Sequence, residues 1–181
     1  MLQFSIKGTG LNGVLSPGTT ALDLLWQQKI IQQEKGRKFE DRYATVYYKF
    51  MADDVEYLSE TKNDSKQLSN RLKWVAYKDM YFSSILIAGN EEFESTTIDS
   101  KMLPEDGSFL KEYKTTTSVP FDLKGNEATD MRFYFGPNQF SLLKSYDDDV
   151  EKADQLDLEK IVPLGWGIFR WVNQYFVIPL F

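Results

Sequence analysis

The sequence predicts a mainly β protein, a sandwich of two sheets with one or two short helices near the C-terminus. Short runs of β-branched and aromatic residues alternate with loops that contain Gly, Pro, Asn and Asp, at a spacing typical of a sandwich. The chain has 181 residues, of which 42% are hydrophobic and 15% aromatic, enough to bury a core within one domain. We therefore expect one sandwich over residues 1–160 and a separate segment over residues 161–181.

The clearest strands follow one another through the middle of the chain. Residues 43–50 (YATVYYKF) alternate two faces, and a turn at 52–54 separates them from 55–58, which predicts a hairpin. The polar stretch 59–70 (SETKNDSKQLSN) is expected to be a loop. Trp26 and Trp74 lie inside strand-like segments and are expected in the core. Further strands are predicted at 4–6, 72–77, 81–87, 93–98, 113–119 and 131–135.

Helix signals are few and come late in the sequence. Asn138 can accept hydrogen bonds from the free amides of a first turn, which predicts a short helix over residues 139–145. A second helix is predicted near residues 168–178.

Composition excludes several kinds of chemistry. The formal net charge is -6, so no uniform positive field attracts a phosphate backbone, and nucleic acid is not expected as a partner. Cys and His are both absent, which leaves no thiol nucleophile, disulfide, Ser-His-Asp triad or Cys/His zinc site. An enzyme would have to use carboxylates, Lys, Tyr or Ser, and we expect no cofactor.

Two motifs resemble ligand sites only superficially. Residues 8–13 (GTGLNG) match the dinucleotide pattern G-x-G-x-x-G, but Pro17 and Gly18 interrupt the helix that must follow, so a turn between strands is expected. Residues 147–151 (DDDVE) gather carboxylates, yet the sixth and twelfth positions of a calcium loop are here Lys152 and Leu158. A solvated acidic loop is expected there, and no metal site.

The C-terminal segment differs from the rest of the chain. Residues 161–181 (IVPLGWGIFRWVNQYFVIPLF) carry one charge, Arg170, but their Pro and Gly residues make a poor transmembrane helix. On a helix, Arg170, Asn173 and Gln174 share a narrow polar stripe. An interfacial helix and a terminal helix packed on the sheet fit this pattern equally well. For the interfacial helix, the membrane-contacting residues are predicted to be Trp166, Phe169, Arg170, Trp171, Tyr175 and Phe176.

Residues 163–173 (PLGWGIFRWVN) resemble the segment that enters the membrane core in the YidC family of membrane protein insertases, relatives of the Oxa-type proteins. The resemblance extends from about residue 22 to 181. Other stretches resemble the family's large periplasmic domain in the same order, namely residues 33–36 (QEKG), 73–76 (KWVA), 81–87 (YFSSILI), 133–137 (FYFGP) and 142–144 (LLK).

The resemblance implies a periplasmic β-supersandwich similar to the galactose mutarotase fold, followed by a juxtamembrane amphipathic segment and an insertase core. It implies location at the inner membrane, on the periplasmic side, and a non-enzymatic role in placing newly made membrane proteins. Implied partners are nascent membrane proteins, the Sec translocon and the membrane surface. The chain opens on strand-like sequence (MLQFSIKGTG) without a signal peptide, so we expect a fragment of a larger domain. The family's functional Arg has no counterpart here, and Arg170 does not take its role.

The alternative is a secreted carbohydrate-binding or hydrolytic β-sandwich. It would use exposed Trp or Tyr as a stacking platform and carboxylates for any catalysis. Sugar epimerisation is disfavoured because His is absent. An aromatic cleft with convergent carboxylates would favour the sugar hypothesis, whereas an apolar C-terminal helix directed away from one end of the domain would favour the insertase. A general protein-interaction scaffold is a third possibility.

Overall fold

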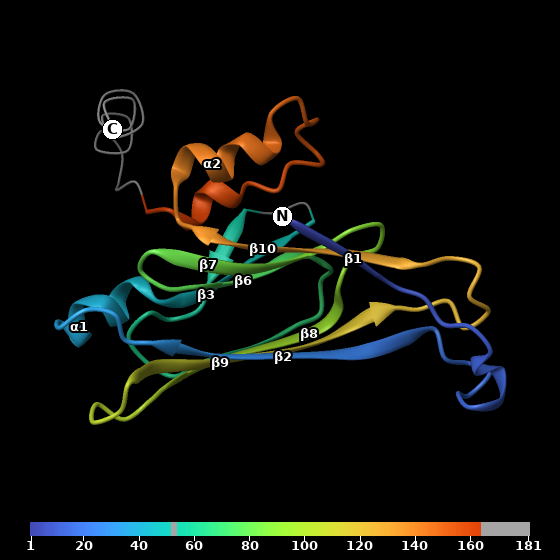
Figure 1. Ribbon diagram of the computed structural model, residues 1–181, viewed down its shortest axis with the longest axis horizontal. Helices are drawn as coiled ribbons and strands as arrows, with labels where there is room; N and C mark the ends of the chain where they lie inside the picture. The colour runs from blue at the N-terminus through green and yellow to red at the C-terminus, as the bar shows by residue number, and fades with distance from the viewer. Residues whose placement is uncertain (52–53, 164–181) are drawn as a thin grey trace.

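The computed structural model describes residues 1–51 and 54–163, which form two antiparallel sheets stacked as a sandwich (Figure 1). The six-stranded sheet has the order β1 (Leu2–Ile6), β10 (Thr129–Pro137), β7 (Phe82–Ala88), β6 (Leu72–Lys78), β3 (Thr45–Phe50) and β4 (Val55–Tyr57). The four-stranded sheet has the order β2 (Ala21–Ile31), β9 (Phe109–Pro120), β8 (Glu94–Met102) and β5 (Asp64–Leu68). The mainly β, two-sheet prediction is confirmed.

The predicted strands are present, and the β3–β4 hairpin pairs Tyr47 with Tyr57. The prediction of a loop over residues 59–70 is wrong in part, because β5 occupies its centre and pairs with β8. This strand lies at a sheet edge and exposes Ser65 and Gln67, while Leu68 alone contributes a buried apolar side chain. Edge strands are commonly polar, so the composition of β5 resembled that of a loop and the strand was not predicted.

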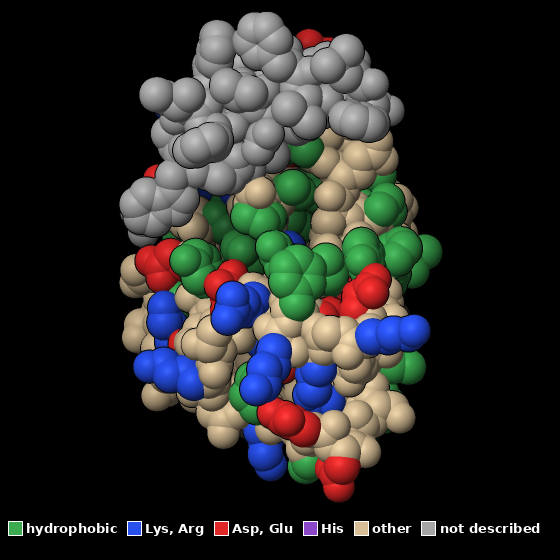
Figure 2. All heavy atoms as spheres, turned by 90° about the vertical axis from the view of Figure 1, so that its left-hand side faces the viewer, with side chains coloured by type: hydrophobic (Ala, Val, Ile, Leu, Met, Phe, Trp, Pro, Cys, Tyr) green, Lys and Arg blue, Asp and Glu red, His purple; other side chains and the backbone are tan. Residues whose placement is uncertain are grey.

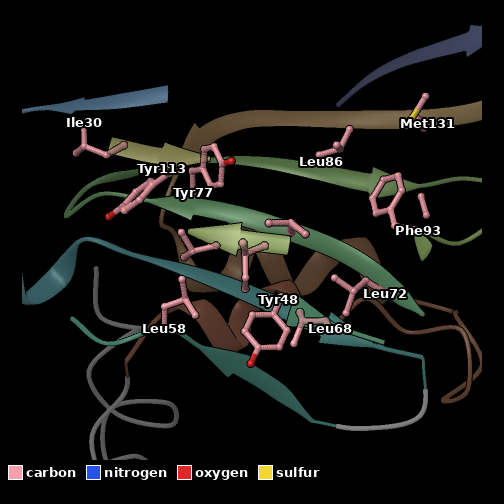
Figure 3. Close-up of a cluster of buried hydrophobic side chains, with 14 of the residues drawn as sticks. Ile30, Tyr48, Leu58, Leu68, Leu72, Tyr77, Leu86, Phe93, Tyr113 and Met131 are labelled. Carbon is pink, nitrogen blue, oxygen red and sulfur yellow. The ribbon is translucent and has the colours of Figure 1, made fainter. Parts of the chain in front are cut away.

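Most of the core lies between the two sheets (Figure 3). Tyr48, Tyr77 and Tyr113 are buried there among aliphatic side chains. Trp26 lies at the margin of this core, half-buried, with its ring stacked on Tyr77 at 3.7 Å between centroids. Trp74 is fully buried on the opposite face of the six-stranded sheet. Trp74 thus belongs to the core as predicted, and Trp26 closes the core's edge.

A layer of short helices covers the outer face of the six-stranded sheet (Figure 1). It contains α2 (Phe140–Lys144) and the 3-10 helices η3 (Ser145–Asp147) and η4 (Leu158–Ile161). The predicted helix near residue 140 is confirmed, but its predicted cap is wrong. Gln139 occupies the N-cap position, and the Asn138 amide instead donates to the carbonyl of Asp79 at 3.0 Å. The Asn138 side chain therefore bonds the turn between β6 and β7 instead of capping the helix.

The glycine-rich motif is a turn between strands, as predicted. The 3-10 helix η1 (Leu11–Gly13) follows β1, and β2 begins at Ala21 without a phosphate-binding helix between them. Gly8 is needed for packing, since a Cβ there would lie 2.5 Å from the ring of Phe121. Gly125 has a φ of +69°, and its Cβ would lie 2.1 Å from the carbonyl oxygen of Gly8.

The helical segment between β2 and β3 was not predicted. Helix α1 (Arg37–Glu40) continues into the 3-10 helix η2 (Asp41–Tyr43) between β2 and β3, at one end of the sandwich (Figure 1). Four residues are too few to produce an amphipathic period, so the sequence carries no readable signal. Within the described residues, none of the helices is both long and apolar enough to cross a membrane.

Candidate functional site

The residues predicted to contact a membrane lie outside the described part of the chain. These are Trp166, Phe169, Arg170, Trp171, Tyr175 and Phe176, together with the predicted helix over residues 168–178. The described chain ends at Pro163, beside the end of the sandwich that carries α1 (Figure 1). The site is therefore built from two described parts, the layer that leads to Pro163 and the α1 end itself.

Residues 140–163, here called the anchor layer, are fixed to the six-stranded sheet through its buried outer face. Leu158 and Ile161 are fully buried against Trp74 and its neighbours. The indole Nε1 of Trp74 donates to the carbonyl of Leu156 at 2.7 Å, and the ammonium of Lys73 donates to the carbonyl of Ala153. A buried indole needs such a partner, so this bond orients both the ring and the chain above it.

A buried ion pair adds a second attachment. Lys49 Nζ on β3 lies 2.7 Å from Asp157 Oδ2, and the two side chains are 7% and 19% exposed. Lys160 approaches the other oxygen of Asp157 at 3.3 Å. Burial alone would raise the pKa of Asp157, but the hydrogen bond and charge of Lys49, together with Lys160, hold it below its usual value.

The acidic run has a structural use within the same layer. The carboxylate of Asp147 accepts hydrogen bonds from the backbone amides of Leu156 and Asp157, both at 2.7 Å. Asp148 and Asp149 are exposed. In the part of the chain that the structure describes, no group of three or more acidic residues is arranged to hold a metal ion. Asp147 therefore closes the loop that positions Asp157 beside Lys49.

Asp157→Asn is expected to lower the free energy of unfolding by about 2–3 kcal/mol at pH 7, because it removes the buried pair with Lys49. Asp157 has a φ of +54°, which Asn adopts readily, so the substitution changes charge with little backbone strain. Because the folded pKa of Asp157 lies below its unfolded value, this stability is present above about pH 4 and is lost as pH falls through the folded pKa. Urea denaturation of the variant and the wild type at pH 7 and at pH 3 measures the difference in their free energies of unfolding at each pH. A difference at pH 3 as large as the difference at pH 7 would contradict the ion-pair assignment.

The α1 end is held by hydrogen bonds to distant parts of the chain. The Arg37 guanidinium donates to the carbonyls of Leu103 at 2.8 Å and Phe109 at 2.9 Å, where β8 ends and β9 begins in the four-stranded sheet. The buried carboxylate of Glu40 accepts from the amides of Gln33 and Glu34, at 2.9 and 3.0 Å. A two-turn segment that would be marginal alone is thereby given one defined position.

A buried lysine completes this attachment. Lys111 Nζ, from β9, donates to the carbonyls of Asp41 at 2.8 Å, Ala44 at 2.5 Å and Glu60 at 2.6 Å. Its side chain is fully buried, and burial lowers its pKa to about 8, while the charges of Asp41 and Glu60 act in the opposite direction. Lys78 Nζ similarly donates to the carbonyl of Tyr43 at 2.5 Å. Two buried lysines therefore donate to backbone carbonyls of η2.

Sequence reasoning missed these lysines, although a signal was present. Lys111 shares its strand face with Tyr113, Thr115 and Val119, all of which are buried. A lysine on the inward face of a strand requires acceptors, and the loops at that end of the sheets supply them.

The outer face of the four-stranded sheet has a shallow hollow of about 420 Å³. Carboxylates of Asp64, Asp99 and Glu112 line it, but no aromatic residue does. Asp99 already accepts a hydrogen bond from Ser65, and Glu112 accepts one from Gln27. The aromatic platform that the carbohydrate hypothesis requires is not part of this hollow.

The architecture defines the class: an antiparallel two-sheet β-sandwich domain with a helical layer fixed to one sheet. Within that class, residues 23–179 match the family model described as the YidC periplasmic domain. The chain belongs to the YidC periplasmic domain family.

Relatives named "Membrane protein insertase YidC" align along the whole chain. A protein of Parabacteroides distasonis is 71% identical over 181 residues, and one of Azobacteroides pseudotrichonymphae is 48% identical over the same length. A protein of Bacteroides fragilis is 41% identical. In each case the alignment covers all of this chain but only 28% or 29% of the relative. The chain therefore spans less than a third of the length of these relatives.

Proposed function

We propose that this chain is the periplasmic domain of an inner-membrane insertase that supports the insertion and folding of newly made membrane proteins. The match of residues 23–179 to the periplasmic family, with relatives named as insertases, carries the proposal. Its role is positional and non-enzymatic, with no cofactor. Nascent membrane proteins are the proposed substrates, and components of the Sec translocon are proposed partners.

The proposed division is a periplasmic sandwich over residues 1–160 and a juxtamembrane segment over residues 161–181. The anchor layer supports a fixed attachment just before this segment, because the Trp74 and Lys49 contacts hold the chain at Leu156 and Asp157, and the buried Ile161 extends the attachment one residue past the proposed boundary. Trp166, Phe169, Trp171, Tyr175 and Phe176 are proposed to lie at the bilayer surface, with Arg170 directed to lipid phosphate. A rigid connection would set the height and direction of the sandwich relative to the membrane.

A chimera tests the function directly. The corresponding 181 residues of the Parabacteroides distasonis insertase, 71% identical to this chain, are replaced by this chain. We expect the chimera to insert a reporter membrane protein within about twofold of the parent, because the two segments align over their full lengths. The same chimera with Trp171→Ser and Phe176→Ser is expected to insert less.

Expression and membrane location of each chimera are measured in parallel, and the unmodified parent is the reference. A chimera that accumulates in the membrane but inserts no reporter would contradict the proposed function. A double variant that inserts as well as the unmodified chimera would contradict only the interfacial role of Trp171 and Phe176.

A further inference from the structure

The exposed aromatic side chains of the described residues gather at one end of the sandwich. There are six of them, between 40% and 63% exposed, and here they are called the aromatic rim: Phe39, Tyr57, Tyr81, Phe82, Phe109 and Phe135. Single exposed apolar residues are ordinary on a protein surface, but a cluster of large aromatic ones marks an interaction site. Figure 2 shows hydrophobic side chains gathered in a band across this end.

Strand register explains why these residues lie at the same end of the sandwich. In the six-stranded sheet, Tyr57 pairs with Tyr47 near the start of β3, and Phe82 at the start of β7 pairs with Pro137 at the end of β10. In the four-stranded sheet, Phe109 at the start of β9 pairs with Ile31 at the end of β2. Arg37 bonds the Phe109 carbonyl, and the Tyr81 hydroxyl donates to Glu34 at 2.6 Å. Strand ends of both sheets therefore converge on α1.

We propose that the aromatic rim is a second membrane-contact surface, through which the sandwich itself rests on the headgroup region of a lipid bilayer. This inference rests on the proposed function, because it places the α1 end toward the membrane. Phe and Tyr suit the membrane–water interface, because their rings are apolar and the Tyr hydroxyl can bond to water. The proposed partner is a lipid surface, and a second copy of the chain is an alternative outcome of the test below.

Continuity with the C-terminal segment favours lipid as the occupant. The anchor layer reaches Pro163 on the same side of the molecule as α1 (Figure 1). The sequence from 161 to 181 has 21 residues with one charge, so the most apolar part of the sequence directly follows the anchor layer. A segment of that composition and the rim would meet the same apolar phase.

The backbone that carries Phe39 is held by contacts with both sheets. Phe39 packs on Tyr43 with ring centroids 5.1 Å apart, and the Tyr43 carbonyl is bonded by Lys78. Lys111 binds the carbonyls of Asp41, the first residue of η2, and of Ala44, which follows it. Side chains presented on a fixed backbone lose little further freedom on docking.

Charges at this end are mixed, so the contact should depend on apolar insertion more than on lipid charge. Exposed cations and anions both surround the rim: Lys35, Lys38, Arg42, Glu34, Glu105 and Asp106. Lys29 Nζ lies 5.9 Å from the ring centre of Phe109. We expect binding to zwitterionic phosphatidylcholine vesicles that persists in salt of about 0.5 M, where surface charge effects are largely screened.

The chain has no Cys, so a single introduced Cys can carry an environment-sensitive fluorophore at a chosen point. Labels are placed at Phe39→Cys and at Phe82→Cys in the rim, and at Val14→Cys in the η1 turn as the control. Val14 is 78% exposed and lies next to η1, near the opposite end of the sandwich in Figure 1. Phosphatidylcholine vesicles are added, and co-sedimentation of the whole chain is measured beside the fluorescence.

Both rim labels are expected to shift to shorter wavelength on vesicle addition, while the Val14 label stays unchanged. Phe39→Ser with Phe82→Ser is expected to lower the vesicle partition coefficient about tenfold, since binding scales with buried apolar area. The matched control, Val14→Ser with Leu25→Ser, removes two exposed apolar side chains elsewhere and is expected to change the coefficient less than about twofold.

Failure of this inference can be separated from failure of the juxtamembrane proposal. If the chain co-sediments but the rim labels do not respond, the aromatic rim is not a lipid contact, whereas Trp171 and Phe176 keep their proposed role. Rim labels that respond to protein concentration without vesicles would assign this end to a second copy and overturn the inference. A chain that does not co-sediment at all overturns both membrane contacts.

Discussion

Replacing Lys111 with alanine is expected to lower the free energy of unfolding by about 3–5 kcal/mol. The ammonium group is fully buried and donates to three backbone carbonyls, those of Asp41, Ala44 and Glu60. Alanine leaves these acceptors without that donor and a cavity where the four-carbon stem was. The loss exceeds an ordinary surface effect because all three carbonyls belong to loops that close the α1 end.

Urea denaturation followed by circular dichroism measures this loss. Lys114→Ala is the matched control, because Lys114 lies on the same strand with its side chain exposed, and it should change stability by less than about 0.5 kcal/mol. Lys111→Met restores the apolar stem but no donor, and its stability should fall between those of Lys111→Ala and wild type. An alanine variant within about 1 kcal/mol of wild type would show that Lys111 does not hold these loops together.

Trp74→Ala is expected to cost about 3–5 kcal/mol and to loosen the anchor layer. Among the described residues the indole is the largest fully buried side chain, and it both fills the space beneath Leu158 and Ile161 and donates to the Leu156 carbonyl. Without it, α2, η3 and η4 lose their main apolar partner, and helices this short are not stable by themselves. Hydrogen exchange of backbone amides in residues 140–162 should accelerate more than exchange in β8 and β9.

Trp74→Phe separates packing from hydrogen bonding. Phenylalanine retains most of the buried ring but cannot donate to the Leu156 carbonyl, so a smaller loss of about 1–2 kcal/mol is expected. If exchange in the anchor layer of Trp74→Ala remained as slow as in wild type, other contacts, such as the Lys49–Asp157 pair, would be sufficient to hold it.

The sandwich could be predicted because its strands are rich in β-branched and aromatic residues and are bounded by turn residues. β9 buries one side of its pleat with a period of two, whereas β3 is buried on both faces, because the anchor layer covers its outer side. The edge strand β5 was hidden because its outward face is polar. Helix α1 was hidden because long-range bonds from Arg37 and Lys111, and not a local period, give it its position.

The candidate site was less predictable than the fold. The apolar residues 161–181 stand out in the sequence, but the aromatic rim is assembled from five separate segments of the chain. Tyr57 and Phe82 lie at the same end of the sheet only because β4 and β7 have particular registers, and register depends on tertiary pairing. Asn138 shows the same limit locally, because its side chain bonds the β6–β7 turn instead of the helix that it precedes.

The attachment of the anchor layer has a mechanical consequence. A pull on the chain at Pro163 is first borne by η4, whose neighbour Asp157 is bonded to β3 through Lys49. It is then shared by Trp74 on β6, the strand paired with β3. The load thus enters two adjacent central strands of the sheet instead of an edge, so the sandwich should turn as one body when the following segment moves.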